Sequence, residues 1–124
     1  MTLQLASAND PDPGLVLSKA VLRAAQALGL TQADLGAIIG VSPASVSRMK
    51  DGTLPLSGKP FELAACLVRV FRSLDAIVAG DRRSMQAWIK APNRDLGTVP
   101  RDALREVAGL VEVMAYLDAR RAPL

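Results

Sequence analysis

Residues 30–52 constrain the fold more than any other part of the chain, because they combine two helix starts with a sharp turn. Thr31, with Asp34 three residues later, has the spacing of a capping box, which begins a first helix. Gly40 stands where the chain has to turn, and glycine adopts a left-handed backbone conformation without strain. Ser42, which is followed by a proline, then caps and begins a second helix. The segment therefore predicts a helix-turn-helix.

The two predicted helices carry apolar residues where they would face one another. Gly36 is small enough to let the helices cross closely. The apolar positions are Leu35, Ile38, Ile39, Val41, Val46 and Met49. A helix-turn-helix commonly places its second helix in the major groove of DNA, so DNA binding is the functional interpretation. The alternative is a packing unit that contacts no nucleic acid, because a fold does not dictate a function.

Few side chains on the second helix can read a DNA sequence. Arg48 alone offers the bidentate pair of donors that recognises guanine well, whereas Ser45 and Ser47 contact phosphate as readily as bases. Gln32, at the start of the first helix, is placed to contact a phosphate. The candidate DNA-binding residues are therefore Gln32, Ser42, Ser45, Ser47, Arg48 and Lys50. One such unit binds DNA weakly, so we expect a homodimer on repeated half-sites.

The segment resembles the Xre-type helix-turn-helix of the phage-repressor superfamily. The resemblance is carried by four short runs, which are Leu30-Thr31-Gln32, Leu35-Gly36, Gly40-Val41-Ser42 and Val46-Ser47-Arg48. It implies that operator DNA is one partner of the chain.

The composition favours an all-α fold and excludes most kinds of catalytic centre. Half of the 124 residues are hydrophobic but only 3% are aromatic, so the core has to be built from Ala, Leu, Val and Ile. No stretch has the alternating pattern of a strand. Because the chain has no histidine and a single cysteine, we expect no metal site, no cofactor and no enzymatic activity. That cysteine, Cys66, lies in an apolar helical run and is interpreted as a core residue.

The charge and the apolar pattern bear on partners and location. The net charge of +3 permits DNA binding without arguing for it. Residues 61–79, the longest apolar stretch, are interrupted by charged residues, so we expect no membrane insertion. The N-terminus lacks the pattern of a secretory leader, and we therefore expect a cytoplasmic protein.

Breaker residues and helical patterns divide the chain into three parts. Residues 1–14 contain a cluster of Asn, Asp, Pro and Gly, which predicts a flexible arm. Residues 15–60 comprise a helix over 15–28 that ends at Gly29, then the helix-turn-helix and a linker. Residues 61–124 are predicted to form a further set of helices.

The third part begins with a long helix that ends at Gly80 and is apolar on most sides. Its apolar stripe comprises Leu63, Leu67, Val70, Phe71, Leu74, Ile77 and Val78, and its other side carries Ala64, Ala65, Cys66 and Val68. Such a helix is buried either by its own domain or by the partner in a homodimer.

A helix over 82–90, capped by Asp81, is followed by a loop over 91–99. Asn93 and Asp95 are expected to fix this loop through turn hydrogen bonds. Gly97, near the end of this loop, is expected to allow a backbone turn.

Two helices complete the chain. The first is predicted from Pro100 to about Val107, with Gly109 as its breaker. The last helix is marked by apolar residues at helical spacing, namely Leu110, Val113, Met114 and Leu117. Beyond it, two arginines are expected at a free end.

The second half resembles the toxin-binding domain of Xre/MbcA/ParS-type antitoxins. The resemblance is carried by Trp88-Ile89, Pro92-Asn93, Leu96-Gly97, Pro100, Leu104, Gly109, Val113 and Tyr116-Leu117. Members of that family have an Xre-type motif followed by a helical toxin-binding domain, and this order of parts covers residues 15–120 here. The candidate toxin-binding residues are Trp88, Asn93, Arg94, Gly97, Tyr116, Arg120 and Arg121.

The resemblance implies that the chain is an antitoxin. The implied partner is a RES-domain toxin, which consumes NAD or uses it to modify a target. The antitoxin would cover the active-site entrance of the toxin, and the complex would repress its own promoter. The alternative is a stand-alone transcriptional repressor whose C-terminal helices only form a dimer or sense a ligand.

Several candidate contacts have purely structural alternatives. Trp88 either fills the core beside Met85 or anchors a partner, since tryptophan is enriched at interface hot spots. Tyr116 either packs internally or presents its ring and hydroxyl to a partner. The arginines of the tail are either solvated or reach acidic groups in the toxin cleft.

Overall fold

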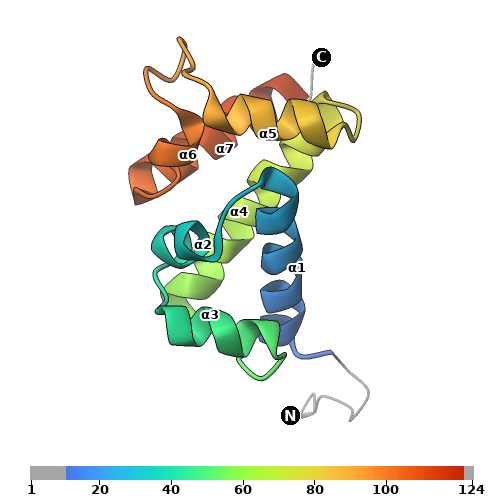
Figure 1. The fold of residues 1–124 in the computed structure, drawn as a ribbon, viewed down its shortest axis with the longest axis vertical. Coiled ribbons are helices and arrows are strands. Elements are labelled where there is room, and N and C mark those ends of the chain that lie inside the picture. The colour runs from blue at the N-terminus through green and yellow to red at the C-terminus, as the bar shows by residue number, and fades with distance from the viewer. Residues whose placement is uncertain (1–10, 122–124) are drawn as a thin grey trace, which may run out of the picture.

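The computed structural model describes residues 11–121, and within that range it has seven helices and no strand, which confirms the all-α prediction (Figure 1). The helices are α1 (Pro13–Leu28), α2 (Gln32–Ile39), α3 (Pro43–Lys50), α4 (Gly58–Ile77), α5 (Arg82–Lys90), α6 (Pro100–Ala103) and α7 (Val107–Arg121). Each of these helices is too short or too polar to cross a membrane.

The helix starts of α2 and α3 form through the predicted caps. The Thr31 hydroxyl accepts a hydrogen bond from the Asp34 amide at 3.0 Å, and the Asp34 carboxylate accepts one from the Thr31 amide at 2.9 Å. This reciprocal pair is the capping box expected from the sequence. The Ser42 hydroxyl accepts from the Ser45 amide at 3.1 Å and so caps α3.

The turn between α2 and α3 depends on two glycines. Gly40 ends α2 with a φ of 75°, as predicted. A Cβ atom on Gly36 would lie 2.9 Å from the Val41 carbonyl oxygen, so only glycine permits this crossing distance. The apolar residues predicted to join the helices are buried, apart from Val41, which is half-buried; the buried ones are Leu35, Ile38, Ile39, Val46 and Met49.

α1 begins at Pro13, two residues earlier than the sequence pattern predicted. The Asp12 carboxylate caps it by accepting a hydrogen bond from the Gly14 amide at 2.8 Å. Gly14 is buried, and a Cβ atom there would collide with the Leu56 carbonyl oxygen. The start of α1 is therefore fixed by the loop that precedes α4. Of the predicted N-terminal arm, residues 1–10 lie outside the described part of the chain.

α4 lies at the centre of the molecule and packs against α1, α2, α5 and α7 (Figure 1). Leu67 and Val70 are completely buried by these neighbours, which favours the interpretation of α4 as a core helix of its own chain. Ile77 was expected in the apolar stripe but is 42% exposed, because α4 ends at this residue rather than at Gly80. Ala79 and Gly80 then turn the chain with positive φ values of 51° and 79°.

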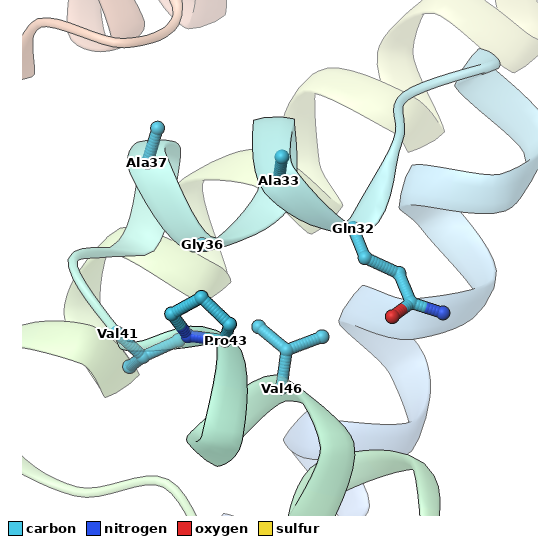
Figure 2. A pocket seen from close by; sticks show the side chains of 7 residues that line it. All are labelled: Gln32, Ala33, Gly36, Ala37, Val41, Pro43 and Val46. Atoms are coloured by element: carbon cyan, nitrogen blue, oxygen red, sulfur yellow. The ribbon is translucent and has the colours of Figure 1, made fainter.

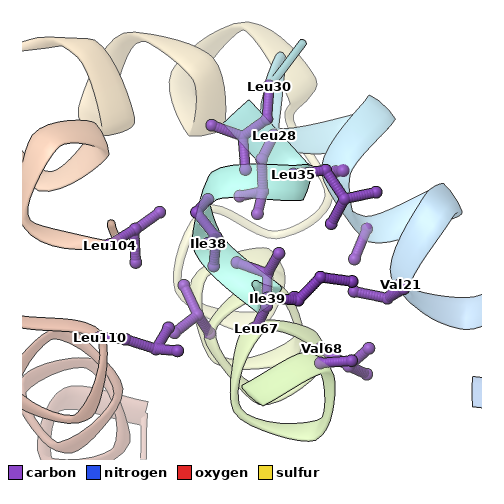
Figure 3. Close-up of a cluster of buried hydrophobic side chains, with 14 of the residues drawn as sticks. Val21, Leu28, Leu30, Leu35, Ile38, Ile39, Leu67, Val68, Leu104 and Leu110 are labelled. Carbon is purple, nitrogen blue, oxygen red and sulfur yellow. The ribbon is translucent and has the colours of Figure 1, made fainter. Parts of the chain in front are cut away.

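One continuous hydrophobic core joins the two halves of the chain. Leu104 and Leu110 of the second half point toward Ile38 of the first half and Leu67 of α4 (Figure 3). Cys66 is half-buried and packs against this core, in agreement with its structural interpretation.

The prediction of a helix from Pro100 to Val107 that is broken by Gly109 is wrong. α6 stops at Ala103, and α7 already begins at Val107, so Gly109 lies inside α7. A Cβ atom on Gly109 would collide with the Ala103 backbone. The glycine is therefore used for the close approach of α7 to α6, and a sequence pattern cannot distinguish this use from a helix break.

Two polar contacts link the first half of the chain to the second half. Arg105, between α6 and α7, forms an ion pair with the carboxylate of Asp34, which is also the capping-box acid of α2. The Gln86 side-chain amide donates to the Ala27 carbonyl oxygen at 3.1 Å. Asp34 therefore stabilises both the start of α2 and the contact between the halves.

Replacing Gly109 with alanine tests the close approach of α7 to α6. We expect Gly109→Ala to lower the free energy of unfolding by about 1–3 kcal/mol through overpacking, although alanine has the higher helix propensity. Ala108→Gly, at the exposed neighbouring position, is the control and should cost about 1 kcal/mol through propensity alone. Urea unfolding of the variants measures both values, and a Gly109→Ala protein more stable than wild type would contradict the explanation.

The ion pair of Asp34 predicts a specific pH dependence of stability. Burial alone would raise the pKa of Asp34, but hydrogen bonds from Thr31 and Arg105 lower that pKa below its ordinary value of 3.8. The folded state therefore favours the ionised carboxylate, whose stabilising effect is complete above the ordinary pKa and is lost as the pH falls through the lowered pKa.

Asp34→Asn should therefore be less stable than wild type near neutral pH, and the difference in free energy of unfolding should shrink as the pH falls below about 4. Urea unfolding over a pH series measures this difference. Glu62→Gln, at an exposed position of α4, is the control. A difference that stays constant over the series would show that the charge of Asp34 contributes nothing.

Candidate functional site

The outer face of α3 carries a hydrogen-bonded chain of three polar side chains. The Ser42 hydroxyl donates to the Ser45 hydroxyl at 3.1 Å, and the Arg48 guanidinium donates to the same Ser45 hydroxyl at 3.2 Å. Arg48 is exposed, so its remaining donors face solvent. Ser45 therefore holds Arg48, the side chain predicted to read guanine, along the outer face of this helix.

The other predicted DNA-binding residues lie on the same unit. Ser47 and Lys50 are exposed on α3, and Gln32 is the exposed first residue of α2. Between α2 and α3 is a notch with a cavity volume of about 280 Å³. Its lining is mostly apolar and includes Ala33, Ala37, Pro43 and Val46 (Figure 2).

The accessible charges of this unit are mainly positive. α1 carries Lys19 and Arg23 and no acidic residue, and α3 carries Arg48 and Lys50 and no acidic residue. The acid of α2, Asp34, is buried in its ion pair with Arg105 from the second half. This surface suits an anionic partner, and a nucleic-acid backbone is one.

A second group of predicted residues meets where α5, the following loop and α7 come together. The rings of Trp88 and Tyr116 stack with centroids 6.2 Å apart at an interplanar angle of 23°. The Arg120 guanidinium lies 3.9 Å from the Tyr116 ring centroid. Asp95 accepts hydrogen bonds from the Tyr116 hydroxyl at 2.7 Å and from Arg120 at 3.1 Å. We call these four residues the aromatic cluster.

The aromatic cluster is neither fully internal nor fully exposed. Trp88 and Tyr116 are both half-buried and pack against the core on one side. Their other sides, with Arg120 and Asp95, remain accessible. The hydrogen bond to Asp95 raises the pKa of Tyr116, so the phenol stays protonated and continues to donate at neutral pH.

The loop between α5 and α6 has a fixed conformation. The Asn93 side chain accepts from the Leu96 amide at 3.0 Å, and the Asn93 amide donates to the Thr98 carbonyl oxygen at 2.9 Å. Gly97 turns the chain with a φ of 72°. The loop presents the exposed side chain of Arg94. It projects from the end of the molecule opposite to α3 (Figure 1).

The prediction for Asp95 was wrong in its partners. Its carboxylate makes no turn hydrogen bond like that of Asn93, and it instead bonds to Tyr116 and Arg120 on α7. The sequence held no local signal for this role, because the partners lie more than 20 residues further along the chain.

The prediction that the two arginines lie at a free end was also wrong. α7 continues through Arg121, and the described part of the chain ends there; residues 122–124 lie outside it. Arg120 belongs to the aromatic cluster, whereas Arg121 approaches the Ser73 hydroxyl of α4 at 3.5 Å. The fully buried Ser73 also donates to Asp118 at 2.7 Å, which fixes this end of α7 to α4. No sequence motif or periodicity marks Ser73 for this role.

The structure thus brings together Trp88, Tyr116 and Arg120, places Asn93, Arg94 and Gly97 in the adjoining loop, and turns Arg121 toward α4. In residues 11–121 no group of three or more metal-ligating side chains is positioned to hold an ion. The outer face of α3 and the aromatic cluster with its adjoining loop lie at two ends of the molecule (Figure 1), and each carries exposed polar side chains.

Comparison with known proteins gives two consecutive family matches, which meet between residues 69 and 73. Residues 7–69, half of the chain, match the family described as the antitoxin Xre-like helix-turn-helix domain. Residues 73–122 match the antitoxin Xre/MbcA/ParS C-terminal toxin-binding domain. No curated protein matches the chain by sequence.

Among solved structures, the chain is similar to one in the crystal structure of the M. tuberculosis MbcT-MbcA toxin-antitoxin complex. The sequence identity is 30% and the TM-score is 0.66, over 86% of this chain and 94% of that chain. A helix-turn-helix unit, a C-terminal helical domain that shares its core, and both family matches occur here in one chain. The chain belongs to the Xre/MbcA/ParS family of antitoxins, with a helix-turn-helix domain and a toxin-binding domain.

Proposed function

We propose that this antitoxin neutralises a RES-domain toxin by covering the entrance to its active site, and that it represses its own promoter. A RES-domain toxin consumes NAD or uses it to modify a target. The observation that carries the proposal is the likeness, over 86% of the chain, to a chain of the MbcT-MbcA toxin-antitoxin complex. The chain itself needs no cofactor or catalytic group for this function, and it acts in the cytoplasm.

The two activities are assigned to the two halves of the chain. Residues 15–60 bind operator DNA through Gln32, Ser42, Ser45, Ser47, Arg48 and Lys50. Residues 61–124 bind the toxin. The supporting geometry is that α3 and the loop after α5 lie at opposite ends of the molecule, so both partners have room at once (Figure 1).

The aromatic cluster and its adjoining loop form the proposed toxin contact. Tryptophan, tyrosine and arginine are the residues that most often dominate binding energy at interfaces. Here Trp88 stacks on Tyr116, and Asp95 bonds to both Tyr116 and Arg120. Asn93 and Gly97 set the shape of the loop, while Arg94 and Arg121 add exposed positive charge for acidic groups in the toxin cleft.

A homodimer would strengthen DNA binding. One helix-turn-helix unit contacts only a few base pairs, and a two-fold dimer presents two such units to half-sites that are about one helical turn apart. We therefore assign the chain a dimer within a larger toxin–antitoxin complex.

Growth of bacteria that express the adjacent reading frame tests the antitoxin function. We expect growth arrest when the neighbouring protein is made alone and normal growth when this chain is made with it. Purification of the pair through a tag on one chain should recover both. A harmless neighbour, or one unrelated to RES-domain toxins, would favour a stand-alone repressor instead.

Arg48→Ala tests the DNA-binding half. The lost bidentate contact to guanine should weaken binding to the promoter by about 1–3 kcal/mol and relax the preference for one base pair. Neutralisation of the toxin in the growth assay should be unchanged. Fluorescence anisotropy with promoter DNA measures the first effect. Equal loss of DNA binding and toxin neutralisation would contradict the assignment to two halves.

Trp88→Ala tests the toxin-binding half. Loss of a hot-spot side chain should weaken the complex with the toxin by about 2 kcal/mol or more while leaving promoter binding intact. Phe71→Ala is the matched control, because Phe71 is also half-buried but lies on α4 beneath Arg82. Calorimetry gives the affinity and thermal melting gives the stability. If Phe71→Ala weakens toxin binding as much as Trp88→Ala, the effect is one of folding and the contact assignment fails.

A further inference from the structure

A groove lies between α1, the start of α2 and the end of α3, and we call it the α1–α3 groove. Its cavity volume is about 490 Å³. Its floor is apolar and its rim is polar. The floor is made by Leu22, Ala25, Leu30 and Leu35, and the rim by Gln26, Thr31, Gln32 and Lys50.

Each side chain of the polar rim can donate a hydrogen bond, and the rim contains no carboxylate. Gln26 reaches the rim from α1, Gln32 from the start of α2, and Lys50 from the end of α3. Figure 2 shows the side-chain amide of Gln32 extending from α2 toward α1. All three side chains are exposed, so no folding contact consumes their donors.

Further positive charge continues from the groove along α1. Successive residues of a helix are turned by about 100°, which places Lys19 and Arg23 on the same side of α1 as Gln26. Both are exposed. Between Pro13 and Leu28 α1 carries no acidic residue, and its one neighbouring acid is the N-cap Asp12.

Two of the nearby acids, Asp12 and Asp51, are exposed, but neither lines the α1–α3 groove. Asp34 is buried and paired with Arg105. Asp51 follows Lys50 as the C-cap of α3, and Asp12 is the N-cap of α1, so the exposed charges of α1 and α3 remain positive in sum. A group of donors with a net positive field and no carboxylate fits a phosphate oxygen.

We infer that the α1–α3 groove seats a backbone phosphate of the bound DNA, with Gln26 of α1 as a donor opposite Gln32 and Lys50. The inference rests on the proposed DNA binding and extends the contact surface to α1. Lys50 lies two residues after Arg48 on α3. With α3 in the major groove of DNA, Arg48 faces the bases. Lys50 and the α1–α3 groove of the protein then lie beside the DNA strand at the edge of the major groove.

Lys19 and Arg23 then lie beside the following phosphates of the same strand. Contacts of this kind fix the position of a protein on DNA but carry no sequence information. Their loss should therefore weaken binding to every sequence alike, unlike the loss of Arg48.

Fluorescence anisotropy with two duplexes tests the inference. One duplex covers the promoter upstream of this chain's own reading frame, and the other is a scrambled sequence of equal length and composition. Full-length protein, alone and bound to its toxin, is titrated over a series of salt concentrations. Thermal melting confirms that each variant is folded.

Gln26→Ala should weaken binding to both duplexes about tenfold, because a hydrogen bond to a charged phosphate is lost. The dependence on salt should stay unchanged, since glutamine carries no charge. Gln26→Glu should weaken binding further, because its carboxylate faces the phosphate. Lys19→Gln and Lys50→Gln should each reduce the slope of log affinity against log salt by about 0.9.

Arg83→Gln is the control, because Arg83 is an exposed arginine on α5 and its loss changes the net charge by the same amount as Gln26→Glu. If the Gln26 variants bind like this control while Arg48→Ala still loses its preference for the promoter, the groove assignment is overturned and the proposed DNA binding stands. If the wild-type protein binds neither duplex, with or without toxin, both are overturned.

Discussion

Both halves of the protein depend on the burial of α4. This helix is covered by α1 and α2 from the first half and by α5 and α7 from the second, and its residues Leu67 and Val70 have no exposed surface. Removal of apolar surface from water is the dominant stabilising contribution in a fold of this size, and here both halves obtain it from the same helix. The helix-turn-helix and the toxin-binding domain are therefore parts of one packed structure rather than two independent modules.

This shared core has consequences for function. Each proposed binding surface is built on helices that pack either against α4 itself or against a helix that contacts α4, and these contacts set their orientation. The ion pair of Arg105 with Asp34 adds a polar connection, because the same carboxylate that begins α2 also accepts from the second half. The start of α2, where Gln32 lies, is therefore in direct contact with the second half.

Local rules were sufficient wherever the determining contact is within a few residues. The capping box of Thr31 and Asp34, the cap at Ser42 and the left-handed turn at Gly40 were all predicted, because each involves groups within three residues or one backbone angle. The same rules failed at Gly109, where the relevant neighbour belongs to another helix.

The candidate sites show the same limit. The sequence identified Trp88 and Tyr116 as separate alternatives between core and interface, and the structure shows that they stack and are each half-buried. Arg120 was assigned to a free end, although its charge is held by Asp95 in a loop more than 20 residues earlier. No periodicity or motif relates residues that meet only after the helices have packed.

The sequence by itself determined the all-helical class, the helix-turn-helix with its caps, and the family to which the chain belongs, because these follow from local backbone preferences and from the order of short motifs. Only the tertiary structure decided that α4 serves both halves, that Asp95 holds the aromatic cluster, and that α1 borders the groove beside α3. The physical reason is that these features depend on which helix faces meet in space, and the packing that selects those faces is a property of the whole chain.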